Sequence, residues 1–334
     1  MQVNPSGLPP PRYVYGPVPS HRLGRSLGVD IVSHKRCTYD CVYCQLGRTT
    51  HLTAERSDDA PVSAVLDELH GVLASGPRPD FVSIAGSGEP TLHAGIGELL
   101  RGLRRLTDVP RAVLTNGSLL WMPEVQDALL DADVVLPSLD AGSEPVFRAV
   151  NRPHASVSFE RMTAGTAEFT RRFRGEVWLE VMLVAGMNDD RASVSDIASL
   201  VRRIAPARVQ LTTVQRPPAD PSVRRVREED LRTLARMFDG RVDIVTEHAP
   251  GGSRESARPL MQEPDDIRRR ILALVARRPC TAADIARAVE MNVLHALKRL
   301  DELRAAGDVR VVVSDGHPYY TAADTVPSSG RVHQ

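Results

Sequence analysis

Three of the four cysteines in the sequence lie within eight residues of one another near its beginning. Cys37, Cys41 and Cys44 follow the spacing C-x3-C-x2-C in a polar loop segment. Three thiolates suit three of the four irons of a [4Fe–4S] cube. The fourth iron then stays open and can hold the amino and carboxylate groups of a small ligand. The spacing therefore predicts a catalytic iron–sulfur cluster.

Other interpretations of these cysteines stay open on the sequence alone. A structural zinc ion usually takes four ligands, and His34 or His51 could supply the fourth. Free cysteines are also common in protein cores, although this loop is polar. A disulfide framework is disfavoured, because it would spread the cysteines along the chain and because disulfides are rare in a reducing cytosol. The remaining cysteine, Cys280, is expected to be a small buried residue.

The elements that must position the cysteine loop form an alternating pattern. Short apolar segments, typical of strands buried on both faces, are separated by amphipathic helical patterns. Parallel strands joined by right-handed crossovers predict an α/β protein with a partial (βα)6 TIM-type barrel, and a doubly wound open sheet is the competing arrangement. The cysteine loop follows the first strand, on the side where active sites of parallel barrels gather. The strand-like segments are residues 26–32, 80–86, 111–115, 133–139, 177–184 and 208–214.

A C-x3-C-x-aromatic-C motif after a first strand resembles the signature of the radical S-adenosylmethionine (SAM) superfamily. Residues 86–90, which end the second strand, resemble the glycine-glycine-glutamate-proline motif of that superfamily. The resemblance implies that this segment meets the amino group of SAM, and glycine lets a backbone approach a ligand closely. Tight-turn chemistry is the alternative explanation of such a segment.

Further positions match SAM contacts of molybdenum-cofactor-type radical SAM enzymes. Two of them lie at the end of the third strand and two at the end of the fourth, where ordinary turn sequences are the alternative. An aromatic residue of the cysteine motif is implied to pack beside the adenine, or else it anchors the loop. The candidate SAM-binding residues are Tyr43, Gly86, Ser87, Gly88, Glu89, Pro90, Thr115, Asn116, Ser138 and Asp140.

A closer resemblance covers residues 13–250 and includes the segments NRPH at 151–154 and TTVQRPP at 212–218. These segments look like an uncharacterised group of prokaryotic radical SAM proteins near the wyosine-type tRNA synthases. The resemblance implies that a reduced cluster passes one electron to SAM and that the resulting 5′-deoxyadenosyl radical takes hydrogen from a substrate. It supplies no substrate. It also implies a small electron donor protein of the flavodoxin or ferredoxin type.

No protein acid or base is required for radical formation, so no catalytic residue is assigned. His21, Arg22, Arg25 and Arg152 are candidates to line an anionic substrate pocket, and solvated surface charge is the plainer explanation of each. Residues 1–36 contain no cysteine for the second cluster of wyosine-type synthases. That absence argues against wyosine synthesis. Modification of another tRNA base stays an alternative.

Beyond the barrel, the sequence predicts a smaller C-terminal unit. Three helical patterns are followed by a hairpin with its turn at Asp315 and Gly316, an order that resembles a winged-helix domain. His295, Lys298 and Arg299 could meet phosphates, so nucleic acid is a possible partner, and an iron–sulfur or zinc regulator that binds DNA is an alternative function. The predicted boundaries are a lead-in loop at 1–26, the barrel at 27–250, a linker at 251–264, the winged-helix-like domain at 265–323 and a disordered tail at 324–334.

The overall composition excludes some classes of protein. Lys plus Arg and Asp plus Glu each number 42 among 334 residues, so no global field draws the chain to nucleic acid or to an anionic membrane. The first residues have no apolar run typical of a signal peptide, and no segment approaches the roughly 20 apolar residues of a membrane helix. A cytoplasmic protein without a membrane partner is therefore expected.

Overall fold

The computed structural model describes residues 13–20, 22–245 and 264–323 of the chain. The described residues form one eight-stranded sheet in the order β1-β2-β5-β6-β7-β8-β9-β10. All neighbours from β2 to β10 pair in parallel, and β1 pairs with β2 in the antiparallel sense. The strands are β1 (Val14–Ser20), β2 (Gly24–Val29), β5 (Phe81–Ile84), β6 (Arg111–Thr115), β7 (Val134–Pro137), β8 (Glu176–Leu183), β9 (Arg208–Thr213) and β10 (Val242–Val245).

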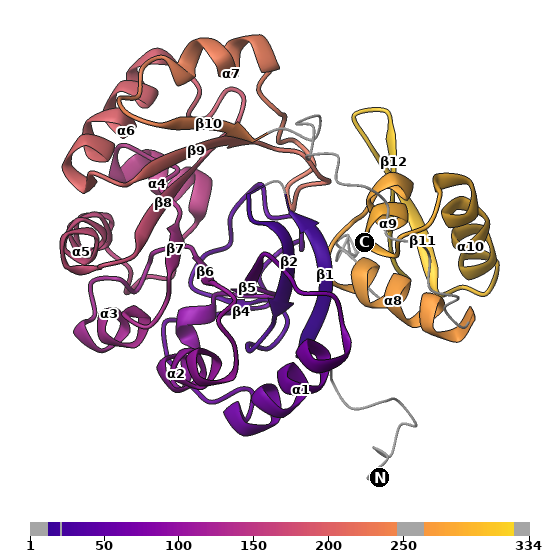
Figure 1. Cartoon of the computed structure of the whole chain (residues 1–334). Helices are drawn as coiled ribbons and strands as arrows, with labels where there is room; N and C mark the ends of the chain where they lie inside the picture. Colours follow the sequence, from indigo (N-terminus) through magenta and orange to yellow (C-terminus); the bar gives the residue numbers. More distant parts are fainter. Residues whose placement is uncertain (1–12, 21, 246–263, 324–334) are drawn as a thin grey trace, which may run out of the picture.

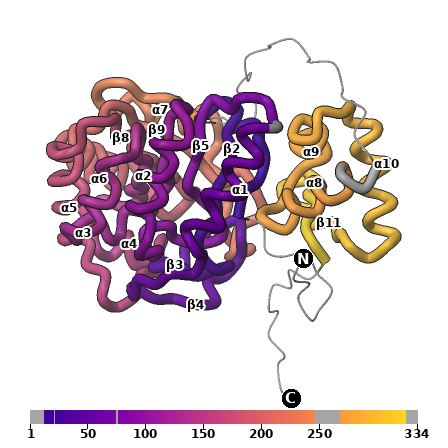
Figure 2. The backbone as a smooth tube through the Cα atoms, turned by 60° about the horizontal axis from the view of Figure 1, so that its bottom comes forward, coloured from indigo at the N-terminus to yellow at the C-terminus, as the bar shows by residue number. Residues whose placement is uncertain are grey.

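The order of the parallel strands decides between the two predicted arrangements. A doubly wound sheet reverses its strand order at a switch point, whereas here the spatial order follows the chain order throughout. The sheet curls, and the helices that connect its strands lie outside it (Figures 1 and 2). The predicted partial TIM-type barrel is therefore confirmed, with one more parallel strand, β10, than the six that the sequence indicated.

One sequence prediction was wrong at the start of the chain. The segment expected as a lead-in loop contains β1 and the beginning of β2. Proline lacks a backbone N–H, so a proline-containing segment is a poor candidate for a central strand but is tolerated at a sheet edge. β1 is such an edge strand, and it buries Val14 and Val18 while Pro17 and Pro19 lie on it.

The outer layer of the barrel consists of α1 to α7 (Figure 1). Two buried apolar clusters fill the space between these helices and the sheet, one beneath the N-terminal half and one beneath the C-terminal half. The cysteine loop carries the short parallel pair of β3 (Arg36–Cys37) and β4 (His51–Leu52). The helices are α1 (Val62–Ser75), α2 (Ile96–Leu106), α3 (Pro123–Leu129), α4 (Glu144–Asn151), α5 (Phe159–Arg172), α6 (Arg191–Ile204) and α7 (Glu228–Ala235), with a short 3-10 helix η1 (Pro90–Leu92).

The C-terminal module, as residues 264–323 are called below, contains three helices followed by a hairpin. Thr281 caps its second helix through a capping box with Asp284, and the hairpin turns at Asp315 and Gly316, both with positive φ. This order of elements agrees with the sequence pattern, and its assignment as a winged-helix-like domain stays a prediction. The elements are α8 (Pro264–Arg277), α9 (Ala282–Ala288), α10 (Val293–Ala305), β11 (Val309–Ser314) and β12 (His317–Ala322).

The module packs against the barrel at two places. Val18 of the edge strand β1 belongs to the apolar core of the module. The loop after β9 is joined to the module by a hydrogen bond from the Tyr319 hydroxyl to the Gln215 carbonyl, at 2.8 Å. The module therefore lies across the open side of the curled sheet, between β1 and the end of β9 (Figure 1).

The predicted linker, apart from Pro264, and the predicted tail lie outside the described residues. None of the helices in the described part of the chain has the length and apolarity that crossing a bilayer requires.

Candidate functional site

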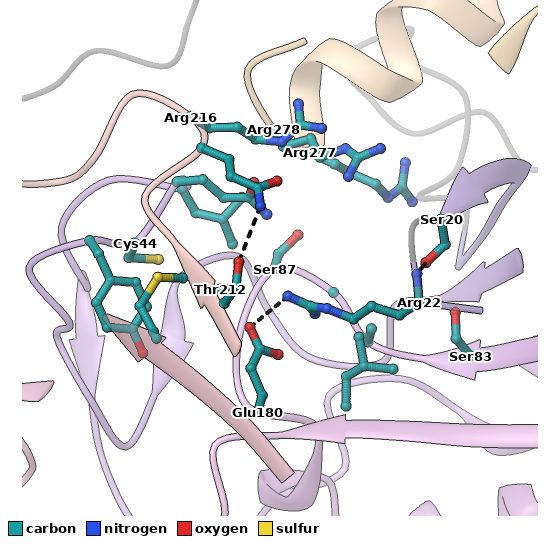
Figure 3. A pocket seen from close by; sticks show the side chains of 18 of the residues that line it. Ser20, Arg22, Cys44, Ser83, Ser87, Glu180, Thr212, Arg216, Arg277 and Arg278 are labelled. Atoms are coloured by element: carbon teal, nitrogen blue, oxygen red, sulfur yellow. Dashed lines mark hydrogen bonds and ion pairs between the residues drawn. The ribbon is translucent and has the colours of Figure 1, made fainter. Parts of the chain in front are cut away.

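A cavity of about 450 Å³ lies inside the curled sheet and reaches the C-terminal module. Its volume falls in the ordinary range of small-molecule sites. The three cysteines of the predicted cluster all line it, together with Gly86, Ser87 and Gly88. Two segments that the sequence singled out separately therefore face the same space, as Figure 3 shows for Cys44 and Ser87.

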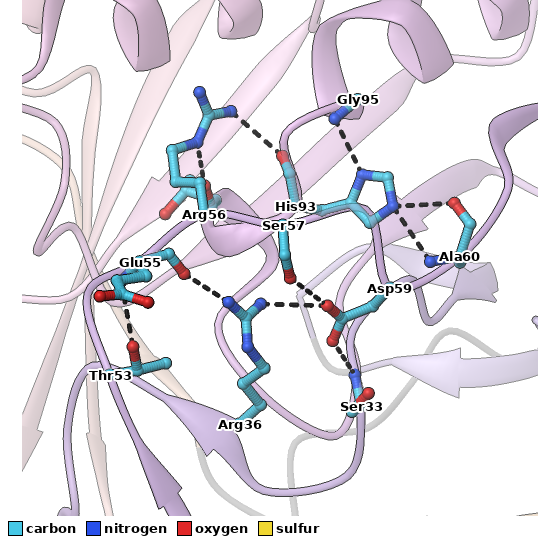
Figure 4. A network of polar contacts seen from close by, with 11 residues as sticks. Ser33, Arg36, Thr53, Glu55, Arg56, Ser57, Asp59, Ala60, His93 and Gly95 are labelled. Atoms are coloured by element: carbon cyan, nitrogen blue, oxygen red, sulfur yellow. Dashed lines mark hydrogen bonds and ion pairs between the residues drawn. The ribbon is translucent and has the colours of Figure 1, made fainter.

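A polar network holds the beginning of the cysteine loop (Figure 4). The guanidinium of Arg36 donates to the Glu55 carbonyl and lies 3.3 Å from a carboxylate oxygen of Asp59. The other oxygen of Asp59 accepts the backbone N–H of Ser33 at 2.8 Å. Both charged side chains of this ion pair are less than a tenth exposed. The residue before Cys37 is thus fixed by contacts with a segment about twenty residues away in the sequence.

Each cysteine sulfur accepts a nitrogen donor from the protein. The Cys37 sulfur lies 3.5 Å from the backbone nitrogen of Tyr39 and 3.5 Å from Nδ2 of Asn116. The Cys41 sulfur accepts from Nδ2 of Asn151 at 3.4 Å, and the Cys44 sulfur from Nζ of Lys35 at 3.2 Å. Hydrogen bonds to the sulfurs are one of the means by which proteins tune iron–sulfur clusters.

The thiols of Cys37 and Cys41 hold their protons tightly when no metal is bound. Burial, followed by the nearby Glu89 carboxylate, raises the pKa of Cys37 to about 12. Burial, followed by Asp140, also raises the pKa of Cys41 well above its usual value. Metal ligation needs thiolates, so a bound metal must displace these protons. Three half-buried cysteines that line one cavity and have nitrogen donors at their sulfurs fit the donor set of a three-thiolate cluster.

The histidines considered for a zinc site do not share the cavity. His34 and His51 are both exposed and are not among the described residues that line it. The described part of the chain also holds no group of three or more His, Cys, Asp or Glu side chains placed to bind a metal ion. A cube binds its cysteines through separate irons rather than through one ion. Among the described residues that line the cavity, there is therefore no histidine to serve as a fourth zinc ligand.

The loop of residues 86–90 is hydrogen-bonded directly to the cysteine loop. The backbone N–H of Lys35 donates to the Ser87 carbonyl at 2.6 Å, and that of Glu89 donates to the Arg36 carbonyl at 3.1 Å. A side chain at Gly88 would place its Cβ 2.0 Å from the Arg36 carbonyl oxygen. Glycine is needed here because two backbones approach each other.

Glu89 lies behind the cavity wall, although the resemblance implied a contact with SAM for the motif. It is 2% exposed, and Pro90 beside it is also buried; neither is among the described residues that line the cavity. Its carboxylate accepts the backbone N–H groups of Thr91 and Asn116 at 3.0 and 2.7 Å, as well as the Thr115 hydroxyl. Glu89 therefore ties the end of β6 to the loop after β5.

Of the remaining predicted SAM contacts, Tyr43 and Asp140 are joined to each other beside the cysteine loop. Asp140 accepts hydrogen bonds from the Tyr43 hydroxyl, from Asn151 at 2.7 Å and from the Met182 backbone N–H at 3.0 Å. Tyr43 also lines the cavity, whereas Asp140, Thr115, Asn116 and Ser138 are not among its described lining residues. Ser138 is half-buried and forms an isolated backbone bridge with Glu180.

Asp140 is expected to make the stability of the cluster-free protein depend on pH. Burial raises the pKa of its carboxyl from 3.8 to about 6 in the folded state. The folded state therefore holds this proton more tightly, and the resulting stabilisation is full below about pH 4 and lost as the pH rises through about 6. Two pKa units correspond to about 3 kcal/mol. We expect the free energy of unfolding of the wild type to fall by up to that amount between pH 4 and 7, relative to Asp140→Asn.

Urea denaturation of both cluster-free proteins across this pH range measures the difference. The comparison with Asp140→Asn removes the contribution of every other titrating group. Two curves that stay parallel would show that Asp140 titrates normally.

Of the predicted substrate-pocket cations, one lines the cavity. Arg22 does so, with its guanidinium 2.6 Å from Glu180 (Figure 3). Arg25 is exposed, and Arg152 forms an ion pair with Asp220 at 3.0 Å; neither is among the described lining residues. His21 lies outside the described residues.

Sequence reasoning missed three other cavity arginines. Arg216 follows β9, Arg277 ends α8, and Arg278 comes directly after that helix. The signals in the sequence were the segment TTVQRPP, which contains Arg216, and the pair of adjacent arginines before the capped helix. The meaning of that pair depends on where the module docks.

Comparisons with known proteins agree with this geometry. The family model of the Radical SAM superfamily matches residues 31–196. A UPF0026 protein of Helicobacter pylori is 33% identical over 294 residues, which are 87% of this chain and 92% of that protein. A protein of Brachyspira hyodysenteriae named GTPase Obg is 34% identical over 309 residues, which are 91% of this chain and 44% of that protein. This chain thus spans less than half of the Brachyspira protein.

Among solved structures, Streptococcus suis SuiB bound to its precursor peptide SuiA matches with a TM-score of 0.51 at 16% identity, covering 69% of this chain and 51% of that one. This likeness concerns the fold alone. The cysteine loop, the 86–90 loop that is locked to it and the curled parallel sheet lie within or overlap the matched region. The chain belongs to the UPF0026 family within the radical SAM superfamily.

Proposed function

We propose that the chain holds a [4Fe–4S] cluster on Cys37, Cys41 and Cys44, cleaves SAM reductively and abstracts a hydrogen atom from a substrate. One observation carries the proposal: the cysteine loop and the loop of residues 86–90 line the same cavity and are hydrogen-bonded to each other. When bound, the cluster would supply one electron to SAM, which yields methionine and a 5′-deoxyadenosyl radical. The electron comes from a small flavodoxin- or ferredoxin-type donor protein.

The residues of this chain position the reactants and keep water away. Lys35, Asn116 and Asn151 offer N–H groups to the three sulfurs. Gly86, Ser87 and Gly88 line the cavity, where backbone carbonyl groups would accept hydrogen bonds from the amino group of SAM. Tyr43 is held by Asp140 with its ring at the cavity wall and provides a surface for the adenine.

A regulator that binds DNA through the C-terminal module is the main competing function. Such a protein has no use for a loop that cradles a small ligand beside the cysteines. The cavity arginines from the module also favour an enzyme, because they face the barrel rather than solvent. Modification of a tRNA base stays within the proposed chemistry and differs only in substrate.

The test is anaerobic reconstitution with iron and sulfide, followed by dithionite and SAM. We expect a brown protein with about four irons per chain, an electron paramagnetic resonance signal that changes when SAM is added, and 5′-deoxyadenosine in the product mixture. A colourless protein with one equivalent of zinc would contradict the proposal.

A further inference from the structure

The C-terminal module supplies part of the wall of the cavity. Leu274, Arg277 and Arg278 reach it from the end of α8, and Asp284 reaches it from α9. Figure 3 shows Arg216, Arg277 and Arg278 along one side, with Cys44 on another. This wall and the cysteine loop therefore belong to one cavity.

The wall is fixed to the barrel by buried polar contacts. The guanidinium of Arg216 donates to the Pro279 carbonyl at 2.5 Å and lies 3.3 Å from Asp284. The side chains of Arg216 and Asp284 are only 12% and 14% exposed. Arg277 lies over the ring of Tyr15 on β1, with its guanidinium carbon 4.4 Å from the ring centre. Arg216 and Arg277 thus connect the module to both sides of the barrel opening.

The described lining residues carry five cationic side chains and two carboxylates. Arg22 is paired with Glu180, and Lys35 is directed to the sulfur of Cys44. The other carboxylate among the described lining residues is that of Asp284, which lies 3.3 Å from Arg216 and also binds Arg287 from outside the cavity at 2.8 Å. Within the described part of the chain, Arg278 makes no hydrogen bond or ion pair through its side chain. This side of the cavity has an excess of positive charge.

An anion is the partner that such a wall fits. Guanidinium groups match phosphate and carboxylate oxygens geometrically, and charged hydrogen bonds strengthen where water is excluded. A phosphate has three free oxygens and up to two charges, so it can engage three arginines where a carboxylate offers two oxygens. We propose that Arg216, Arg277 and Arg278 bind a phosphate group of the substrate, and that the C-terminal module thereby completes the active site.

This inference rests on the proposed function for what happens at the cysteine end of the cavity, but phosphate binding needs no SAM cleavage. The phosphate can belong to a small phosphorylated molecule or to a nucleotide of an RNA. Both sources present the same chemistry to the arginines, so a competition experiment must separate them.

The experiment measures binding of inorganic pyrophosphate to the cluster-loaded full chain by equilibrium dialysis at low salt. Variants are Arg278→Gln and the double variant Arg277→Gln/Arg278→Gln. The matched control is Lys298→Gln/Arg304→Gln, which removes the same charge from exposed positions of α10 in the same module. Thermal unfolding verifies that each variant is folded, and Arg278→Gln removes no hydrogen bond or ion pair that its side chain makes with a described residue.

We expect Arg278→Gln to weaken binding about tenfold, the contribution of one charged hydrogen bond, and the double variant to weaken it further. The α10 control should change the dissociation constant less than twofold. Displacement of pyrophosphate by unfractionated tRNA assigns the phosphate to a nucleic acid, and failure of tRNA to compete assigns it to a small molecule.

The inference is overturned if the wild type binds no pyrophosphate, or if the cavity variants and the α10 control weaken binding equally. SAM cleavage is measured on the same wild-type preparation. SAM cleavage without phosphate binding would contradict this inference and leave the proposed function standing. Phosphate binding by a protein that neither holds a cluster nor cleaves SAM would contradict the proposed function and leave this inference standing.

Discussion

Cys37→Ala, Cys41→Ala and Cys44→Ala are each expected to lose the reconstituted cluster and to form no detectable 5′-deoxyadenosine. All three sulfurs line one cavity, and each accepts a nitrogen donor. Removal of one cysteine leaves two thiolates for a cube that needs three protein ligands. No histidine lies among the described lining residues to replace the lost thiolate. Iron analysis, visible absorbance and chromatography of the products measure the effect.

The matched control is Cys280→Ala. Cys280 is 1% exposed and belongs to the apolar core of the C-terminal module, where its thiol donates to the Arg278 carbonyl at 3.4 Å. This variant should keep its iron and its product, with a loss of stability of about 1 kcal/mol from the smaller side chain and the lost weak hydrogen bond. If a cysteine-loop variant keeps a full cluster, that cysteine is not a ligand.

Gly88→Ala is expected to destabilise the protein by about 3 kcal/mol and to prevent it from holding the cluster. The added Cβ would lie 2.0 Å from the carbonyl oxygen of Arg36, which is a backbone atom and cannot rotate away. Overpacking of this kind typically costs about 1–3 kcal/mol, and here it also pushes on the residue that precedes Cys37. Urea denaturation measures the stability, and iron content after reconstitution measures the cluster.

A glycine in open space provides the comparison. Gly71 lies on the exposed side of α1, and a Cβ there meets nothing within 4 Å. Gly71→Ala should raise the stability by about 0.5–1 kcal/mol, because alanine favours the helix, and should leave the iron content unchanged. Equal behaviour of the two variants would mean that the contact between the 86–90 loop and the cysteine loop has no role in holding the cluster.

The barrel was predictable from sequence because its strands are buried on both faces and its helices are amphipathic. The predicted strand at 111–115 coincides with β6, and the others shift by a few residues at their ends. β1 was missed because its prolines are compatible with a strand only at a sheet edge, and edge position is a property of the whole sheet. β10 was missed because it contains a charged residue, Asp243, and buries only Val245, whereas the equally short β5 and β7 are mostly buried and carry no charge.

The site was predictable where its chemistry depends on the spacing of residues along the chain. It was not predictable where it depends on how distant elements, such as the C-terminal module, pack against the barrel. Three cysteines within eight residues point to a metal site without any knowledge of the fold. The internal role of Glu89 was not evident, because its partners at Thr115 and Asn116 come from another strand. Arg277 and Arg278 lie more than 230 residues from Cys44, and only the packing of the module on β1 brings them to the same cavity.

The position of the module across the barrel opening also has a consequence for biosynthesis. Residues 264–323 leave the ribosome about 220 residues after the cysteine loop, which at roughly 5–20 residues per second is a delay of roughly 10–45 s. During that interval the barrel emerges with its lateral opening uncovered. If the chain holds the proposed cluster, iron and sulfide can reach the three cysteines through this opening before residues 264–323 are translated and cover it.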